Sequence, residues 1–540
     1  MKAQSQTIDH LGIVAGVMKD IGLVELINNR IPTDGREEIS TGEAIAGMII
    51  NGLGFSDRPM TLTPQFFQNK ALDKLFREGV EDRHFNRFKL GRALDRCHAY
   101  GCDALFAEIS LAVCKKEGVD CRFNSEDTTT FSLTGEYEEC CDEHTIRITH
   151  GYSKDHRPDL KQAVLELLVS QDGGIPLYSR SWSGNQSDSI IFRERAQALV
   201  QSFKNAPTPR YLIGDCKLYA KETVEGPLMD VPFITRIPSS IKRENEVIKE
   251  ALQTDLDSWE KLDDRNCFKE VRLRHYQQEQ RWMVISSKDM KAQAKYSVDK
   301  TVLRERVSLE KALKKIESKA FSSEAGVKAA IEQMCAKAKF HHCNVSLNKK
   351  KKYKSKGRPT RSSEYTFVYY VEGNLSKNEH SISELMDQKS CYVIATSISG
   401  EDLSASAVID AYKGQNRSVE RGFRFLKDPL FFVSSLFVKK TERIMAMLMI
   451  MTLALLVYSI AERQMRQALK TQNSTLPNQI KKEISNPTLR WIFQLMIGIS
   501  FVKVTIGEER YEEYSGLTEL HRRIICCFPE PTAKIYGLAA

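Results

Sequence analysis

The feature that most limits how this chain can fold is an apolar segment near its C-terminal end. Residues 444–460 (IMAMLMIMTLALLVYSI) carry no charged side chain. A transmembrane helix needs about 17–25 apolar residues, so the segment stands at the short limit for crossing a bilayer. A helix that is apolar on all sides can equally form the centre of a large core. Because we find no second such segment and charged sequence flanks this one, we predict a buried helix and no membrane partner.

The charge and the cysteines narrow the class of protein further. The formal net charge of +9 permits a polyanionic partner without requiring one. No apolar signal segment opens the chain, and 13 scattered cysteines fit reduced thiols, so we expect a cytoplasmic protein. Two groups could suggest zinc, Cys97-His98 with Cys102 and His341-His342-Cys343. Neither has a second ligand pair at the usual spacing, which argues against a structural zinc.

Helical patterns dominate residues 1–118, which we predict to be an N-terminal helical domain. Apolar residues recur at helical spacing over residues 11–27, and Ser40 to Glu43 has the form of a capping box before an apolar helix. Further helices are expected at 90–94 and 104–113. Several short helices suit a DNA-binding module, and a helical packing or dimerisation domain fits the pattern equally well.

Strand patterns begin near residue 120 and predict a mixed α/β sheet. Residues 121–133 (CRFNSEDTTTFSL), 163–169 and 175–178 read as three strands, followed by an amphipathic helix over 189–203. Short strands follow at 211–213 and 231–236. We assign residues 119–240 to the first part of an α/β core.

The remaining chain is assigned to three regions. Residues 241–390 form a predicted α+β insertion, with helices at 241–262, 301–319 and 322–337 and strands at 281–286 and 365–371. Its basic run, Lys349–Lys352 with Lys354 and Lys356, is expected in a loop that is solvated or follows a phosphate backbone. Residues 391–468 complete the core with a strand at 391–396 and one helix over 405–427. Residues 469–540 are a mostly helical tail.

Two aspartates stand where carboxylates could hold metal ions. Asp127 lies in the middle of the first strand, where a charge is costly unless it is paired or bound to metal. Glu126 must face the other side because side chains alternate along a strand. Asp215 ends an apolar strand, a position that suits either a ligand or a turn cap. Taken alone, a solvated edge position for Asp127 and a cap for Asp215 remain open.

A third carboxylate lies on the helix predicted over residues 405–427. At about 100° per residue, Tyr412, Glu420 and Lys427 share one face, and Arg424 follows one turn after Glu420. Phe423 and Phe425 indicate that the helix is packed as well. A partly buried acid among cations suits a metal site that faces a phosphate backbone, and a solvated face with ion pairs is the alternative.

With these residues in place, the chain resembles the DDE transposases of bacterial insertion sequences. It is most similar to the insertion-sequence-four superfamily, in its sixteen-thirty-four branch. Tyr412, Arg417, Glu420 and Lys427 match the family's last motif, with six residues between Glu420 and Lys427. The family usually has Arg three residues after the Tyr and four before the Glu. Gln415 and Asn416 hold those positions here, so Arg417 departs from the pattern by one residue.

Other stretches extend the resemblance over about residues 8–460. They are 90–95 (LGRALD), 127–131 (DTTTF), 151–159 (GYSKDHRPD), 184–188 (GNQSD) and 233–238 (FITRIP). Each is weak alone, and their order and spacing together are specific.

The resemblance implies an RNase H-like mixed-sheet catalytic core with an insertion domain before the last helix. Asp127, Asp215 and Glu420 would be the catalytic residues and would hold two Mg²⁺ ions, with Mn²⁺ as a substitute. Tyr412, Arg417, Arg424 and Lys427 would grip DNA, as would Lys154, His156 and Arg157 in a loop between the first strands. The partners would be terminal inverted repeats and target DNA, bound by a homodimer that bridges two ends.

Two functions therefore compete. One is an active transposase that cuts at inverted repeats and joins 3′-hydroxyl ends to target DNA. The other is an inactive or repurposed copy that still binds DNA through residues 1–118. Intact Asp127, Asp215 and Glu420 favour the first.

Overall fold

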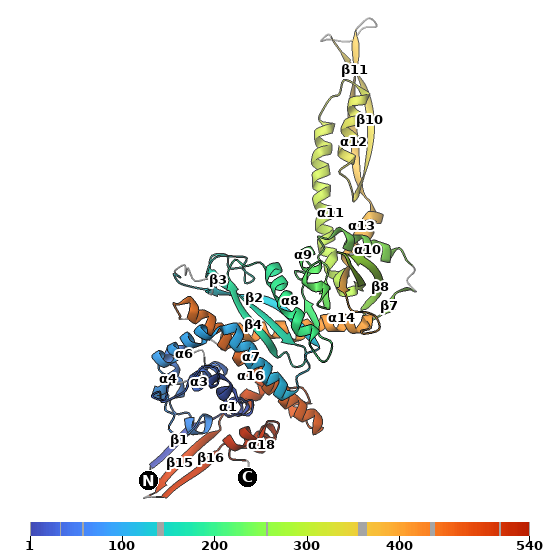
Figure 1. Ribbon diagram of the computed structural model, residues 1–540. Coiled ribbons are helices and arrows are strands. Elements are labelled where there is room, and N and C mark those ends of the chain that lie inside the picture. Colours follow the sequence, from blue (N-terminus) through green and yellow to red (C-terminus); the bar gives the residue numbers. More distant parts are fainter. Residues whose placement is uncertain are drawn as a thin grey trace. The chain divides into compact units, whose positions relative to one another are not determined.

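The computed structural model describes residues 2–32, 34–56, 59–137, 145–254, 258–354, 364–431, 438–506 and 509–538. The chain divides into two compact units (Figure 1). The core unit comprises residues 1–235, 276–278 and 407–540, and the inserted unit comprises residues 236–275 and 279–406. All the carboxylates singled out above belong to the core unit.

The core unit begins with short helices, as the sequence predicts. They are α1 (Leu11–Asp20), α2 (Leu23–Asn28), α3 (Thr41–Leu53), α4 (Thr63–Phe67), α5 (Leu72–Leu75), α6 (Arg87–Tyr100) and α7 (Cys102–Glu117), with 3-10 turns η1 (Met60–Leu62) and η2 (Asp82–Phe85). The predicted capping box is confirmed, since the Ser40 hydroxyl accepts from the Glu43 amide and the Glu43 carboxylate accepts from the Ser40 amide. This pair satisfies two amide groups at the start of α3 that the helix itself leaves open.

The helical segments at the two ends of the chain are joined by strands that the sequence did not predict. Strand β1 (Lys2–Thr7) pairs antiparallel with β15 (Ser500–Ile506), which pairs with β16 (Glu509–Ser515). The expectations of a wholly helical start and a mostly helical tail are wrong at these places. Strand β1 is polar throughout (KAQSQT), so its conformation comes from backbone pairing with β15 and not from its own side-chain pattern.

The α/β part of the core unit follows the predicted order of elements. Its strands are β2 (Phe123–Leu133), β3 (Lys161–Ser170), β4 (Pro176–Ser183), β5 (Tyr211–Gly214) and β6 (Phe233–Arg236), which lie in the order β4-β3-β2-β5-β6. Strands β2, β3 and β4 are antiparallel neighbours, whereas β5 runs parallel to β2 and to β6. Helices α8 (Asp188–Lys204) and α9 (Lys221–Val224) and the turn η3 (Pro227–Met229) separate the later strands. A mixed α/β class is confirmed.

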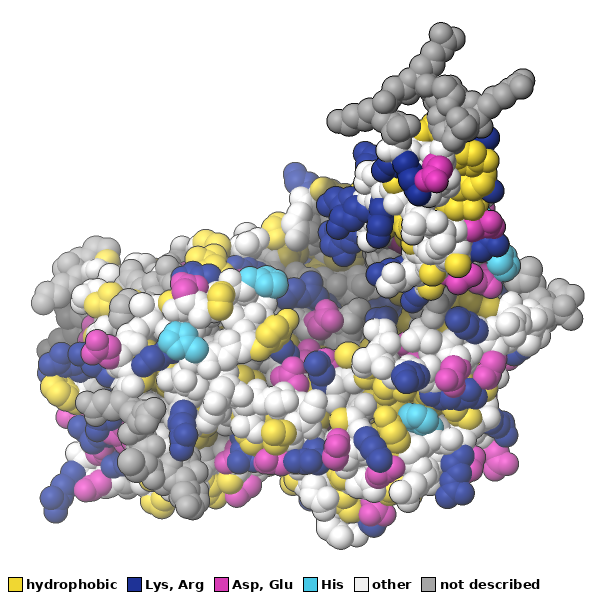
Figure 2. Space-filling view, turned by 90° about the horizontal axis from the view of Figure 1, so that it is seen from above, with side chains coloured by type: hydrophobic (Ala, Val, Ile, Leu, Met, Phe, Trp, Pro, Cys, Tyr) yellow, Lys and Arg dark blue, Asp and Glu magenta, His cyan; other side chains and the backbone are white. Residues whose placement is uncertain are grey.

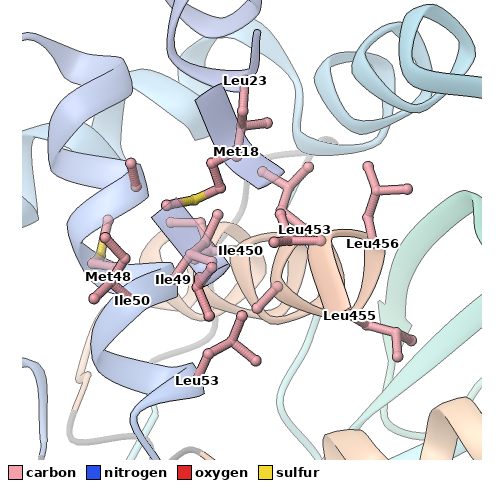
Figure 3. Close-up of a cluster of buried hydrophobic side chains, with 14 of the residues drawn as sticks. Met18, Leu23, Met48, Ile49, Ile50, Leu53, Ile450, Leu453, Leu455 and Leu456 are labelled. Carbon is pink, nitrogen blue, oxygen red and sulfur yellow. The ribbon is translucent and has the colours of Figure 1, made fainter. Parts of the chain in front are cut away.

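The apolar segment forms the middle of α16 (Thr441–Thr471), a helix at the centre of the core unit. By length and composition α16 could span a membrane, but 94% of its most apolar window is buried inside the structure. Ile450 and Leu453 lie on the side of α16 that faces Met18 of α1 and Ile49 of α3 (Figure 3). This burial agrees with the interpretation as a central core helix. After α16 come β13 (Leu476–Pro477), β14 (Glu483–Ile484), α17 (Leu489–Leu495), α18 (Glu519–Ile525) and α19 (Glu530–Ile535).

The single helix predicted over residues 405–427 is wrong. The chain forms α14 (Ala405–Gly414), a 3-10 turn η5 (Gln415–Arg417) and α15 (Val419–Leu426), with Ser418 at φ −109° and ψ −84° between the last two. The Ser418 hydroxyl donates to the carbonyls of Gly414 and Gln415, and the Gln415 side chain donates to the Glu126 carbonyl. The local bonds of the Ser418 hydroxyl compete with helix continuation, and the long-range bond of Gln415 holds the break against β2.

The inserted unit contains a sheet part and an elongated part. Strands β7 (Glu260–Lys261), β8 (Asn266–His275), β9 (Gln278–Ser287) and β12 (Cys391–Thr396) follow one another in the order β12-β9-β8-β7, with helices α10 (Lys242–Leu252) and α13 (Glu379–Lys389). Helix α11 (Lys288–Glu317) runs beside a two-stranded ribbon of β10 (His341–Tyr353) and β11 (Tyr365–Lys377), with α12 (Glu324–Cys335) packed on both (Figure 1).

The basic run does not form the loop expected from its sequence. Lys349 to Lys352 lie within β10, and all four pair with residues of β11. Lysine has little preference for strands, so the pairing depends on the aromatic-rich partner strand. Lys356, which continues the run in the sequence, lies outside the described residues.

Candidate active site

Strand register places Asp127 and Asp215 beside each other. In the parallel pair of β2 and β5, Glu126 is opposite Gly214, so the next residue on each strand is one of the two aspartates. Aligned residues of neighbouring strands point to the same side of a sheet. Strand β5 ends at Gly214, whereas β2 continues to Leu133, so the pair lies where a parallel neighbour stops. Ends of parallel strands are where α/β sheets gather ligand groups.

Local backbone bonds fix both carboxylates. The Asp127 Oδ1 atom accepts from the Thr128 amide at 2.7 Å. The Asp215 Oδ1 atom accepts from the Lys217 amide at 2.8 Å, so this side chain also caps the turn that follows β5. The cap and the ligand interpretations of Asp215 are therefore compatible, because a second carboxylate oxygen remains for another partner.

Burial makes the charge on this pair unfavourable. Burial is the main reason that the pKa of Asp127 is raised to about 6. The Lys154 ammonium lowers this pKa, whereas the carboxylates of Asp215 and Asp188 raise it. Burial also raises the pKa of Asp215, opposed by its bond from the Lys217 amide and by Lys154. A cation close to two neighbouring buried carboxylates stabilises their charged forms.

Lys154 supplies such a cation. Its ammonium lies 3.6 Å from Asp127 Oδ1 and 3.5 Å from Asp188 Oδ2, and it donates to the Thr128 carbonyl and hydroxyl at 2.7 Å. The Thr128 hydroxyl donates to Asp188 Oδ1 at 2.6 Å. Predicted as a DNA contact, Lys154 here points toward the carboxylates.

Asp188 is a residue that the sequence analysis did not single out. It is the last residue of the motif 184–188 and the first of α8, and it lies beside Thr128 and Lys154. Asp is a common residue at the start of helices. Its position in the sequence therefore does not indicate a role in the site. Only the position of α8 against β2 shows that this third aspartate joins the pair.

Helix α15 packs on the sheet face to which Asp127 points. Asp127 is directly opposite Leu167 of β3, so the two share a face. A Cβ atom on Gly422 would lie 3.4 Å from the Leu167 side chain and 3.2 Å from that of Leu455, so α15 lies close to both β3 and α16 at this residue. Glu420 is two residues before Gly422, on the exposed side of α15. The break at Ser418 means that Tyr412 and Glu420 are not on one continuous helix face, contrary to the prediction.

The loop before β3 connects the carboxylates with α15. Asp155, next to Lys154, accepts from the Lys427 ammonium at 2.6 Å. His156 follows with a positive φ of 57°, and Arg157 pairs with Asp159 at 2.7 Å. His156 and Arg157 are exposed. Lys154 and Lys427 thus bind the loop to both sides of the site.

Three other predicted DNA contacts lie on α14, η5 and α15. Arg417 on η5 and Arg424 on α15 are exposed, and Tyr412 on α14 is half-buried. Gln415 separates them from β2, with its side chain buried and donating to Glu126 O at 3.2 Å. The two arginines leave their guanidinium groups on the surface, where phosphates could reach them.

Glu126 faces the opposite side of the sheet, as strand alternation predicts. It is fully buried, and within the part of the chain that the structure describes neither carboxylate oxygen has a hydrogen-bond partner. Burial and the nearby Glu166 raise its pKa well above the ordinary range, with Arg195 opposing them. Glu166 is held by Arg195 at 2.5 Å and by the Trp182 indole at 2.7 Å. Arg195, which holds Glu166, belongs to α8, so α8 packs on this side of the sheet.

The donor set of the site suits a hard divalent cation. Asp127 and Asp215 offer carboxylate oxygens without sulfur or imidazole, which is what Mg²⁺ prefers. Among the described residues, no three His, Cys, Asp or Glu side chains are grouped closely enough to hold a metal ion. Neither Glu420 nor Asp188 therefore completes such a group with the aspartate pair in this conformation. The cysteine–histidine groups considered for zinc form no such cluster either.

Comparison with known proteins gives little beyond this geometry. A family model described as a domain of unknown function (DUF4277) matches residues 3–111, the region of α1 to α7. No curated protein matches the chain. A solved structure similar to it is a piggyBac transposase synaptic complex with hairpin DNA, with 9% identity over 92% of this chain and 82% of that chain, at a TM-score of 0.37. At this TM-score the overlay assigns no residue of the site.

Proposed function

We propose that this chain is a DNA transposase of the DDE class, with an RNase H-like core. It would cut at inverted terminal repeats and join the 3′-hydroxyl ends to target DNA. The observation that supports this most directly is the register of β2 and β5, which brings Asp127 beside Asp215 at the end of a parallel strand. Helix α15, which carries Glu420, packs on the same sheet face.

In this proposal Asp127 and Asp215 hold divalent ions from the sheet and Glu420 contributes from α15. Bound Mg²⁺ or Mn²⁺ would supply Lewis-acid stabilisation of the attacking and leaving oxygens of the phosphodiester. Burial raises the pKa of both aspartates, and a bound divalent cation would offset the cost of holding their charged forms there. Asp188 would stay hydrogen-bonded to the Thr128 hydroxyl, next to Asp127 in the sequence of β2.

The cationic side chains around the site would bind the DNA backbone. Arg417 and Arg424 have exposed guanidinium groups near Glu420, and His156 and Arg157 are exposed on the loop before β3. Such contacts position the substrate without reading its sequence. Lys427 would also bind the DNA backbone once its ion pair with Asp155 is broken. A homodimer in the cytoplasm would bring two element ends together, since paired cleavage needs two active sites.

A second candidate is an inactive DNA-binding protein derived from a transposase. The position of Lys154 favours it, because an ammonium already lies 3.6 Å from Asp127 and neutralises part of the charge that a metal ion would meet. In an active enzyme Lys154 has to move toward the DNA when metal and substrate bind. The two candidates make opposite predictions for metal-dependent cleavage.

The deciding experiment is cleavage of duplex DNA that carries the ends of the element, with Mg²⁺ or Mn²⁺. Wild-type protein should cut at the ends, and Asp127→Asn, Asp215→Asn and Glu420→Gln should each reduce the rate at least about 100-fold while DNA affinity is kept. The control is Glu222→Gln, an exposed glutamate on α9 of the same unit. Full cutting by all three variants would end the assignment, and no cutting by wild type would favour the inactive binder.

A further inference from the structure

The ribbon of β10 and β11 carries an unusual set of side chains on one face. Lys349 is opposite Tyr369, Lys351 is opposite Phe367, and Tyr353 is opposite Tyr365. Cross-strand partners share a face, and alternate residues of each strand do too. The described end of the ribbon therefore has an aromatic face, made of Lys349, Lys351, Tyr353, Tyr365 and Phe367. Lys350 and Lys352 lie on the opposite face.

The rings of the aromatic face are open to solvent. Tyr353, Tyr365 and Phe367 expose 36%, 43% and 39% of their surface. They form a row in which Tyr353 and Tyr365 are 5.9 Å apart and Tyr365 and Phe367 5.4 Å apart, both edge to face. Contiguous exposed apolar surface bordered by polar side chains is a mark of an interaction site.

Helices cover the ribbon only further from its tip. Val371 packs with Phe321 and Val327 beside α12, and Tyr369 borders that cluster. Strand β10 is attached there too, through Val345. Among the described residues, the hydrophobic clusters beside α11 and α12 extend along β11 to Tyr369 and do not include Tyr353, Tyr365 or Phe367. The fold thus anchors one end of the ribbon and leaves the aromatic face uncovered.

The ammonium groups of Lys349 and Lys351 lie against aromatic rings of the ribbon. Lys349 lies 3.8 Å from the ring centre of Phe367, and Lys351 lies 4.4 Å from that of Tyr365. In the described chain, no carboxylate comes within 4.0 Å of any ammonium from Lys349 to Lys352. The adjacent Lys354 differs, since it pairs with Glu364 at 2.8 Å. Dark blue and yellow side chains lie next to each other at this end, at the upper right of Figure 2.

We propose that the aromatic face of this ribbon binds duplex DNA, at a distance along the chain from the carboxylate site. This inference rests on the proposed function, and adds a second DNA-contacting surface to it. A two-stranded ribbon fits a major groove about 12 Å wide. Lysines two residues apart on a strand are spaced by about 6.6 Å and project from the same face, so both can reach the DNA backbone at once. Lys349 and Lys351 of β10 are such a pair.

The arrangement of the rings favours duplex over single-stranded DNA. Stacking on unpaired bases needs free ring faces. Here the ammonium groups of Lys349 and Lys351 lie over the faces of Phe367 and Tyr365, and neighbouring rings meet edge to face. The exposed ring edges instead suit apolar contact with sugars or thymine methyl groups in a groove.

The test compares two double variants of the full-length chain that lose the same charge. Lys349→Ala with Lys351→Ala alters the aromatic face, and Lys350→Ala with Lys352→Ala alters the other. Binding to a fluorescent duplex is measured by anisotropy in EDTA over a range of salt concentrations. We expect the first pair to weaken binding at least about 10-fold at physiological salt and to lower the salt slope by about 1.8. The second pair should change both much less.

Further variants keep the result interpretable. If the alanine pair lowers the melting temperature, Lys349→Arg with Lys351→Arg should restore duplex affinity, and Phe367→Ala alone should weaken it. Equal losses in both double variants would mean diffuse charge and would overturn the assignment to this face. A loss confined to single-stranded DNA would overturn the choice of duplex. Unchanged binding in every ribbon variant, with metal-dependent cleavage intact, would reject the ribbon proposal and keep the proposed function.

Discussion

Burial disfavours the charged form of Asp127, and a nearby cation favours it. The protonation of Asp127 therefore depends on which cation is present. Its side chain is 21% exposed, it adjoins Asp215, and its pKa is raised to about 6 by burial. An acid whose pKa is higher in the folded state favours folding when protonated. That advantage is complete below its ordinary pKa of 3.8 and is lost as pH rises through about 6.

Asp127→Asn should therefore stabilise the metal-free protein at pH 8 by at most about 3 kcal/mol and leave it unchanged near pH 4. Mg²⁺ should raise the melting temperature of the wild-type protein at pH 8 and not that of the variant. Thermal unfolding with EDTA or Mg²⁺ at the two pH values measures both effects. Glu222→Gln on α9 is the matched control, expected to behave as wild type throughout. A variant that is less stable than wild type at both pH values would contradict the argument.

At the scale of elements, the break between η5 and α15 sets where Glu420 lies. Gln415 is 6% exposed and donates to the Glu126 carbonyl, which ties η5 to β2 next to Asp127. The neighbouring Asn416 is exposed. The Gln415 side chain therefore binds η5 to β2, whereas the adjacent Asn416 side chain is exposed to solvent.

Gln415→Ala should lower stability by about 1–2 kcal/mol, because a buried carbonyl loses its donor. It should also reduce cleavage at least about 10-fold with little change in DNA affinity, since Glu420 is then less well positioned. Melting temperature, cleavage rate and DNA affinity are measured beside Asn416→Ala, which should leave all three near wild type. Equal cleavage in the two variants would show that the η5 bond does not position α15.

Comparison of individual elements explains what the sequence could predict. Strands β2 and β5 and helix α8 have strong local patterns, and their predicted positions agree with the structure within a few residues. The break at Ser418 was missed because the Gln415 bond joins residues far apart in the chain. The strand over Lys349–Lys352 was missed because its partner β11 decides it. Asp127 and Asp215 were found as strand residues, whereas the position of Lys154 beside them depends on a loop with no periodic pattern.

At the scale of the whole molecule, α16 joins parts of the core unit that are far apart in sequence. Every residue of α3 is buried, and α3 packs against α16 around Ile49, Ile450 and Leu453 (Figure 3). Arg443 of α16 also pairs with Asp95 of α6 at 2.6 Å. The region of the DUF4277 match, residues 3–111, therefore shares one hydrophobic core with residues near the other end of the chain.

A fragment of residues 1–118 should for this reason not fold as the full chain does. Without α16 it exposes apolar side chains of α3 such as Ile49, and a large exposed apolar surface favours unfolding or association in water. We expect the fragment to bind a hydrophobic dye and to melt without a cooperative transition, whereas the full-length chain should melt cooperatively. Calorimetry and dye fluorescence on both proteins provide the test. A sharp transition in the isolated fragment would show that these helices are a separate domain and that α16 only rests against them.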